Sequence, residues 1–237
     1  MKKIIFIVLL IFNFNSIYSQ IPLPEHPRPD FKRDQWQNLN GKWDFKFDPN
    51  NEGLSNSWFT GEKKFEDKII VPFPWGSKLS GLPDNANIGW YSRDIKVSSE
   101  WKGKKIFITI GASDWETSLW IDGKFVGKHE GGYTPFSFEL TPFLTYGQKH
   151  KIIVRVDDDA GDPNKFSRGH ALYGKQGYGN ARGIWQTVYL EARGSNYFDA
   201  IHFTPDIDNK SVNVKFYFQD KMKTNSSVKL KDRKSVV

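Results

Sequence analysis

Apolar and polar residues alternate with a period of two along several short segments of this chain. The clearest segment, residues 42–47, reads Lys-Trp-Asp-Phe-Lys-Phe. Alternation of this kind is typical of β-strands that bury one face. The pattern predicts strands at residues 42–47, 68–71, 89–97, 105–110, 117–121, 136–140, 149–156 and 186–192.

The segments between these strands carry turn-forming residues. An Asp-Gly pair at 122–123 lies between two apolar segments and predicts a tight hairpin turn with positive φ. Gly131 and Gly132 allow a sharp turn before Pro135. No segment has a sustained helical period, and residues 98–102 predict at most one short helical turn. Short strands with turns every eight to twelve residues or so favour an all-β sandwich or jelly roll.

The composition supports a packed domain. Of the 237 residues, 38% are hydrophobic and 16% are aromatic, which makes disorder improbable. Most of the aromatic residues are expected in the sandwich core, although flat rings can also stack on sugars. The net charge of +7 could suggest nucleic acid. Much of this surplus lies at the two ends, in Lys2, Lys3 and residues 220–237, so we expect no nucleic-acid partner.

Several kinds of chemistry are excluded or disfavoured. The chain has no cysteine, so it has no disulfide, thiolate metal site or cysteine nucleophile. Its five histidines lack metal-ligand spacing, and we expect no metal site built on them. Nucleotide-binding and serine-hydrolase fingerprints are absent from the sequence, so we expect no cofactor.

The two ends of the chain differ from its middle. Residues 1–20 combine two lysines, a short apolar run and a small-residue exit, and they predict a signal peptide of an exported protein, periplasmic or extracellular. The apolar run is too short to span a bilayer, so we expect no membrane association after cleavage. Residues 21–194 form the main predicted domain. After it, segments 200–204 and 211–218 predict two strands of a second unit within residues 195–237.

A series of motifs runs through the main domain in a fixed order. It begins with Arg33-Asp34-Gln35-Trp36 and Gly41-Lys42-Trp43, and continues with Val71-Pro72-Phe73-Pro74-Trp75. The hairpin at 120–124 and Gly131-Gly132-Tyr133-Thr134-Pro135-Phe136 follow. Val154-Arg155-Val156 before three aspartates, Gly174-Lys175-Gln176 and Arg182-Gly183-Ile184-Trp185-Gln186-Thr187-Val188-Tyr189-Leu190 close the series. In this order the motifs resemble the N-terminal sugar-binding domain of family-2 glycoside hydrolases, the β-galactosidase and β-glucuronidase group.

The resemblance implies a fold and an architecture. It implies a galactose-binding-domain-like jelly-roll β-sandwich, followed in residues 195–237 by the incomplete start of an immunoglobulin-like domain with an atypical tail. In the family a TIM barrel comes next and carries two catalytic Glu residues, whereas a truncated gene or frameshift would explain an early end here. We therefore expect a carbohydrate of the β-galactoside or β-glucuronide type as partner, together with the missing catalytic domains, and no turnover by this chain itself.

The resemblance also implies which residues contact the sugar. By its position after the Val-Arg-Val strand, Asp158 matches the substrate-contacting aspartate of the family, with Asp157 as the alternative. Lys175 and Gln176 would support the same loop. Carboxylates suit this role because they accept hydrogen bonds from sugar hydroxyls.

Other interpretations of the acidic loop remain open. Asp157, Asp158, Asp159 and Asp162 could form a solvated turn or bind calcium, although their spacing matches no standard calcium loop. A catalytic pair among them is disfavoured because neighbouring strand residues point to opposite faces. For the whole chain, the alternatives are a carbohydrate-binding module that does not cleave and a structural domain without sugar affinity.

Overall fold

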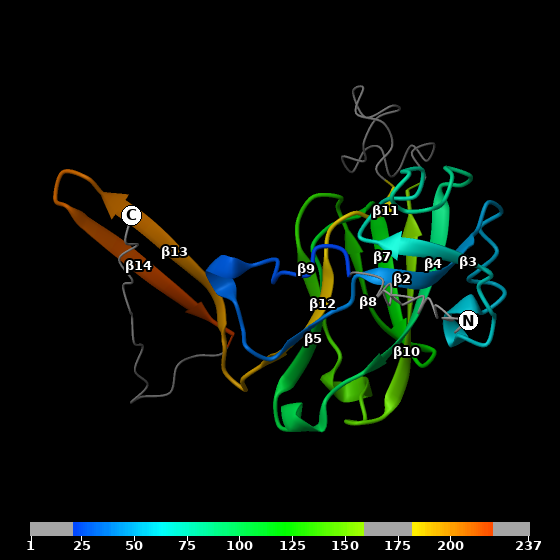
Figure 1. Cartoon of the computed structure of the whole chain (residues 1–237). Coiled ribbons are helices and arrows are strands. Elements are labelled where there is room, and N and C mark those ends of the chain that lie inside the picture. The colour runs from blue at the N-terminus through cyan, green and yellow to red at the C-terminus, as the bar shows by residue number, and fades with distance from the viewer. Residues whose placement is uncertain (1–20, 159–181, 220–237) are drawn as a thin grey trace, which may run out of the picture.

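The computed structural model describes residues 21–158 and 182–219, and within them the chain builds two packed antiparallel sheets (Figure 1). The four-stranded sheet has the order β1 (Trp36–Asn38), β12 (Val188–Arg193), β5 (Lys105–Ile110), β9 (Phe136–Glu139). The six-stranded sheet has the order β3 (Asp67–Val71), β2 (Gly41–Phe47), β4 (Ile88–Lys96), β10 (Lys149–Asp157), β7 (Glu116–Ile121), β8 (Lys124–Glu130). The predicted all-β jelly roll is therefore confirmed.

Smaller elements complete the described chain. The short strands β6 (Ser113–Asp114) and β11 (Gly183–Ile184) pair with each other, as do β13 (Phe198–Asp206) and β14 (Ser211–Phe218). The helical segments are single 3₁₀ turns: η1 (Pro29–Phe31), η2 (Trp58–Thr60), η3 (Ser99–Trp101) and η4 (Thr141–Phe143). No helix in the described residues is long and apolar enough to cross a membrane.

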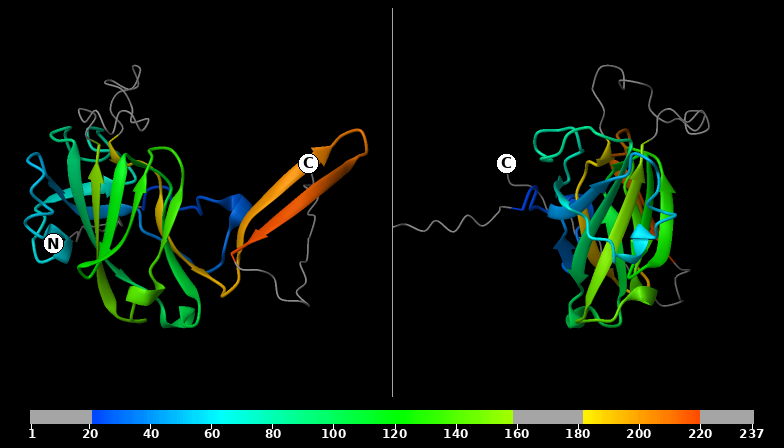
Figure 2. Two further views of the ribbon diagram at one scale, coloured as in Figure 1. Left: turned by 180° about the vertical axis from the view of Figure 1, so that it is seen from behind. Right: turned by 90° about the vertical axis from the view of Figure 1, so that its right-hand side faces the viewer.

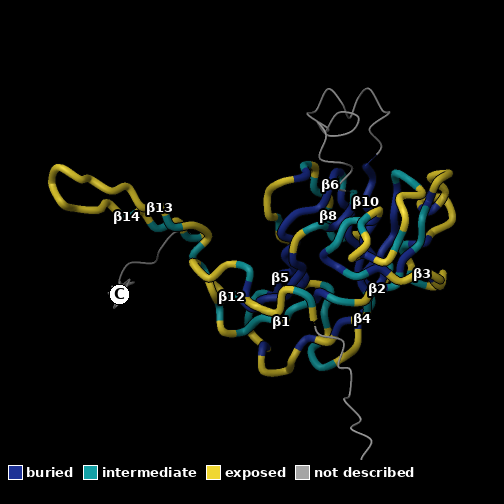
Figure 3. Tube along the Cα trace, turned by 45° about the horizontal axis from the view of Figure 1, so that its top comes forward, coloured by how far each residue is buried: buried dark blue, intermediate teal, exposed yellow. Residues whose placement is uncertain are grey.

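The core lies between the two sheets, where buried residues concentrate (Figure 3). The six-stranded sheet is also buried on part of its outer face. Strand β10 sends Ile152, Val154 and Val156 into the main core, whereas Ile153 packs on the other face with Trp90 and Trp120. Residues from the 48–66 segment, Trp58 and Phe65 among them, cover this second face. Burial on both faces explains why three consecutive residues of β10, Ile152 to Val154, are apolar.

The predicted hairpin turn at residues 122–123 and the predicted short helical turn at residues 98–102 are both confirmed. Asp122 and Gly123 have φ values of 47° and 78° and join β7 to β8, as a hairpin turn with two positive φ values requires. The expected short helical turn is η3, whose Trp101 is buried. Strands β1, β6 and β11 were not predicted, because two or three residues are too few to show a period. Strand β8 was predicted only through its hairpin turn and not as a separate range.

The last two described strands stand apart from the sandwich (Figures 1 and 2). The hairpin β13–β14 forms a sheet of its own, and Phe203, Val212 and Tyr217 on it remain about half exposed. Both strands were predicted from the sequence. Their assignment to an immunoglobulin-like domain stays a prediction, and the predicted signal peptide at 1–20 and the tail at 220–237 lie outside the described residues.

Candidate functional site

The two candidate aspartates lie at the end of β10, where they take part in different interactions. Asp157 follows Arg155 on the outer face of the six-stranded sheet, and its Oδ2 accepts a hydrogen bond from Arg155 Nη2 at 2.9 Å. The same Nη2 donates to Asn51 Oδ1 at 2.9 Å, and Arg155 Nη1 lies 3.7 Å from Glu116 Oε1. Asp157 thus belongs to a buried ion-pair group that joins β10 to β7 and to the 48–51 loop.

Asp158 lies in a different group, one residue beyond the strand. Its backbone N–H donates to the Asn87 carbonyl at 2.9 Å, which fixes it against the start of β4. Its Oδ2 lies 3.3 Å from Arg182 Nε, and Arg182 Nη1 donates to Asp84 Oδ1 at 2.8 Å. The Arg182 guanidinium therefore bridges two carboxylates from separate loops, and Asp158 is only 1% exposed.

Arg182 is held in place by the short strand that follows it. Gly183 has a φ of 81°, and a Cβ there would lie 2.2 Å from the Tyr91 hydroxyl and 2.3 Å from the Trp75 ring. The next residue, Ile184, donates its N–H to the Tyr91 hydroxyl at 3.1 Å, and burial of this phenol raises its pKa. Only glycine permits so close an approach, so the core fixes the backbone beside Arg182.

An aromatic pair lies on the other side of β11. Trp185 Nε1 donates to the Gly132 carbonyl at 2.8 Å, and the Tyr133 ring meets the Trp185 ring edge to face at 6.2 Å. Tyr133 is 68% exposed. Trp185 follows Arg182 by three residues on the same segment. Exposed rings of this kind can stack on the apolar face of a sugar.

A small polar pocket of about 400 Å³ adjoins the backbone of Asp158. Side chains of the 48–51 loop and of residues 85–88 line it, with Asn50, Asn51, Asn85 and Asn87 among them. Asn87 is the residue whose carbonyl accepts the Asp158 N–H. Amide groups both donate and accept hydrogen bonds, and so can bind hydroxyl groups.

The remaining predicted residues are not placed by the structure. Lys175 and Gln176, like Asp159 and Asp162, lie outside the described residues. Within residues 21–158 and 182–219 no group of three or more acidic or histidine side chains could hold a metal ion.

Sequence reasoning did not single out Arg182, Asp84 or Asn87 as site residues. Arg182 stood in the closing motif, but its link to Asp158 depends on contacts between loops that no local pattern encodes. Together, the site offers a carboxylate acceptor, guanidinium donors, amides and exposed rings. These are the groups by which proteins hydrogen-bond sugar hydroxyls and stack on sugar rings.

Comparison with known proteins gives a family match over most of the sandwich. The family described as "Glycosyl hydrolases family 2, sugar binding domain" matches residues 36–193. This range runs from the first residue of β1 to the last residue of β12.

Curated relatives match only in part of their own length. A β-galactosidase of Thermoanaerobacter pseudethanolicus is 26% identical over 83% of this chain and 22% of the relative. A β-glucuronidase of Formosa agariphila is 31% identical over 51% of this chain and 12% of the relative. The chain thus spans less than a quarter of either enzyme.

Solved structures share the fold. The apo structure of a β-glucuronidase from Ruminococcus gnavus aligns with a TM-score of 0.65 and 18% identity, covering 81% of this chain and 35% of the other. A β-glucuronidase from an uncultured Clostridium species aligns with a TM-score of 0.65 and 22% identity over 81% of this chain.

Proposed function

Because the chain belongs to the glycosyl hydrolases of family 2 through their sugar-binding domain, we propose that it binds a β-glycoside through Asp158. The observation that carries the proposal is the arrangement of the Asp158 carboxylate. It lies at the end of β10, where its Oδ2 is 3.3 Å from Arg182 Nε and the Asp158 backbone N–H is held by the Asn87 carbonyl. A carboxylate fixed in this way can accept hydrogen bonds from two neighbouring sugar hydroxyls without losing further side-chain entropy.

The substrate class in this proposal is a β-galactoside or a β-glucuronide. This class is supported by the two relatives named above, a β-galactosidase and a β-glucuronidase that this chain covers in part. Asp157 is assigned a structural role, since its carboxylate accepts from Arg155 within the buried group on the opposite face. Lys175 and Gln176 are proposed to support the same sugar-facing loop.

In this proposal the domain positions the sugar and does not cleave it. Retaining hydrolysis needs two carboxylates about 5–5.5 Å apart on either side of the bond. Asp157 and Asp158 pair with different arginines on different sides of β10, so they do not flank one common space. Hydrolysis of the O-glycosyl bond is therefore assigned to carboxylates of a separate catalytic domain. The protein as a whole is proposed to be exported.

A sugar titration tests the binding role. Methyl β-D-galactoside and methyl β-D-glucuronide are titrated separately into the ¹⁵N-labelled chain, and amide shifts of residues 84–88 and 182–185 are followed. We expect one glycoside to move these signals with a dissociation constant of about 1 mM, as a few hydrogen bonds would give. Asp158→Asn should weaken this binding by about ten- to a hundredfold, because a hydrogen bond to a charged acceptor contributes about 1.5–3 kcal/mol.

The matched control is Asp157→Asn. It alters the neighbouring carboxylate by the same chemistry but is expected to change the affinity less than about twofold, because that side chain lies on the other face. Equal losses in both variants, or no movement of these signals with either sugar, would contradict the proposal. The second outcome would favour a structural domain without sugar affinity.

A further inference from the structure

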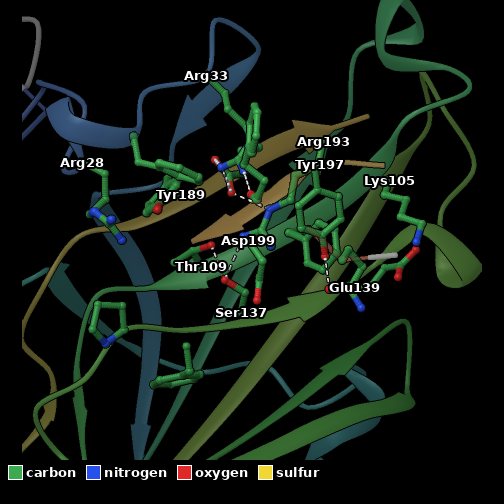
Figure 4. Close-up of a pocket in the computed structure, with 17 residues that line it drawn as sticks. Arg28, Arg33, Lys105, Thr109, Ser137, Glu139, Tyr189, Arg193, Tyr197 and Asp199 are labelled. Atoms are coloured by element: carbon green, nitrogen blue, oxygen red, sulfur yellow. Dashed lines mark hydrogen bonds and ion pairs between the residues drawn. The ribbon is translucent and has the colours of Figure 1, made fainter. Parts of the chain in front are cut away.

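A second pocket lies on the outer face of the four-stranded sheet and shares no lining residue with the surroundings of Asp158 (Figure 4). Its volume is about 450 Å³, within the usual range of small-molecule sites. The floor is made by β12, β5 and β9. One wall is residues 28–33, and the other is the start of β13 with Gln219.

The floor consists of side chains that alternate with the core residues. Strand β5 buries Ile106, Ile108 and Ile110 between the sheets, so Phe107 and Thr109 face outward. In the antiparallel register Thr109 lies opposite Tyr189 on one side and Ser137 on the other. The outward face of a sandwich sheet is commonly solvated. Here the two walls enclose it, and Phe107 and Thr109 are buried.

An ion-pair triad fixes the position of one arginine in this pocket. Glu191 is 1% exposed, and its carboxylate accepts from Arg33 Nη1 at 3.1 Å and from Arg193 Nε at 2.6 Å. The Arg193 guanidinium also lies 3.9 Å from the centre of the Phe107 ring, and its Nη2 donates to Ser137 Oγ at 3.1 Å. A guanidinium has five N–H donors, so Arg193 retains donors for a ligand in a geometry already set by the protein.

Three further charged groups at the pocket stand outside the ion-pair triad. Within residues 21–158 and 182–219, Lys105, Glu139 and Asp199 form neither an ion pair nor a side-chain hydrogen bond, although Lys105 Nζ lies 5.9 Å from the Tyr197 ring. The pocket therefore offers both donors and acceptors. An inorganic anion would use only the donors, and a metal cation only the acceptors, whereas each sugar hydroxyl can donate and accept at once.

Apolar contact is also provided. Phe31 lines the pocket and is partly exposed. Rings beside polar groups suit the C–H face of a pyranose.

We propose that this pocket is a second carbohydrate-binding site, separate from Asp158, and that it holds an uncharged sugar unit of a saccharide. Arg193, Ser137 and Lys105 donate to the hydroxyls of this sugar, and Glu139 and Asp199 accept from them. The site lies on the sheet that does not contain β10, so a saccharide bound there is held independently of the Asp158 site.

An NMR titration of the full chain tests the proposal. Methyl β-D-galactoside serves as the uncharged probe, and sodium sulfate is titrated in a parallel sample. We expect the sugar to shift amide signals of Lys105–Ile110, Phe136–Glu139 and Val188–Arg193, with a dissociation constant of about 1 mM. Sulfate should leave these signals in place.

Variants separate this site from the other. Glu139→Gln and Lys105→Gln remove charges that form no ion pair or side-chain hydrogen bond within the described residues, so the fold should persist, and each should weaken sugar binding here by about two- to tenfold. Lys124→Gln, at an exposed lysine of β8 in the other sheet, is the matched control and should change nothing. Asp158→Asn should leave the shifts at this pocket unchanged, whatever it does to residues 84–88.

Two results would overturn the proposal. The first is that the sugar leaves the signals of β5, β9 and β12 unmoved. The second is that sulfate moves them as strongly as the sugar does, which would identify an anion site. Neither result bears on the Asp158 site, since that site is followed through different amide signals.

Discussion

Charged side chains in this domain are stabilised by interacting with two oppositely charged partners at once. Glu191 lies between Arg33 and Arg193, and Arg182 lies between Asp84 and Asp158. A buried charge without a partner is costly, so each group depends on all its members. The same sharing leaves each arginine in a fixed orientation, which is what a binding site requires.

Glu191→Gln should therefore destabilise the domain strongly. It leaves two guanidinium groups without their carboxylate in a buried setting, and breaking such a pair costs about 3–5 kcal/mol. Urea denaturation followed by tryptophan fluorescence measures the change. Lys68→Gln is the control, because the Lys68–Asp44 pair is exposed and should contribute less than about 1 kcal/mol. Similar losses in the two variants would contradict this account of Glu191.

Two histidines should make the stability depend on pH. Burial lowers the pKa of His26 and of His129 below the ordinary value of 6.5. As the pH falls through 6.5, the unfolded chain therefore binds protons that the folded chain does not, and the free energy of unfolding decreases. Above pH 6.5 neither the folded nor the unfolded chain binds these protons, so the two histidines no longer lower the free energy of unfolding.

The variant His129→Phe isolates one of these two contributions. It keeps a ring stacked on Phe136 and removes the titration, so its melting temperature should fall less between pH 7 and pH 5 than that of the unmodified chain. Parallel melting curves for the two proteins would show that His129 does not contribute.

At the scale of elements, the two-residue strand β11 connects the core to the site. It contacts the core through Gly183 and Ile184, and it carries Arg182 before it and Trp185 after it. A shift of this strand would displace the partner of Asp158 and one ring of the aromatic pair together.

Gly183→Ala tests this dependence. Its φ of 81° is unfavourable for alanine, and the new Cβ would overlap the Tyr91 hydroxyl and the Trp75 ring. We expect a loss of about 3 kcal/mol or more, combining backbone strain with overpacking. Gly103→Ala has a similar φ of 85° but nothing within 4 Å of its Cβ, so it should lose only about 1–2 kcal/mol. Thermal unfolding of both variants makes the comparison, and equal losses would show that close packing at Gly183 has little effect.

At the scale of the whole molecule, the described chain has a sandwich with its own core and a hairpin with little burial. The hairpin contacts the sandwich near its base, where Tyr197 packs on Phe107 and Arg33 Nη2 donates to the Phe198 carbonyl at 2.9 Å. Beyond this base its side chains are mostly exposed (Figure 3). An isolated two-stranded hairpin is only marginally stable in water.

Hydrogen exchange should show this difference in stability. Amides of β13 and β14 should exchange at least about a hundredfold faster than those of β10, because the hairpin can open without disturbing the core. Strands β7 and β8 are the internal control, since they also form a hairpin but belong to the six-stranded sheet. Equal protection in β10 and β13–β14 would mean that the hairpin is stabilised as part of the sandwich.

Local information in the sequence was sufficient for most of the fold. Local apolar patterns predicted β2, β5, β7 and β10, and the Asp122-Gly123 pair predicted the turn between β7 and β8, because strand pleating and turn geometry depend on neighbouring residues. The motifs also indicated the family, and they placed the candidate sugar-contacting residues at the end of β10. Pairing partners for strands of two or three residues could not be predicted, because such strands acquire their hydrogen bonds only from distant segments.

The roles within the site depended on contacts across the chain. Three consecutive aspartates look alike in the sequence, and only the position of Arg155 on one face and Arg182 on the other distinguishes Asp157 from Asp158. The pocket at Arg193 likewise needs residues 28–33, three strands and the start of β13 to meet. The alternation of strand residues decides which way a side chain points, but the charge that it meets there is set by the packing of segments far apart in the sequence.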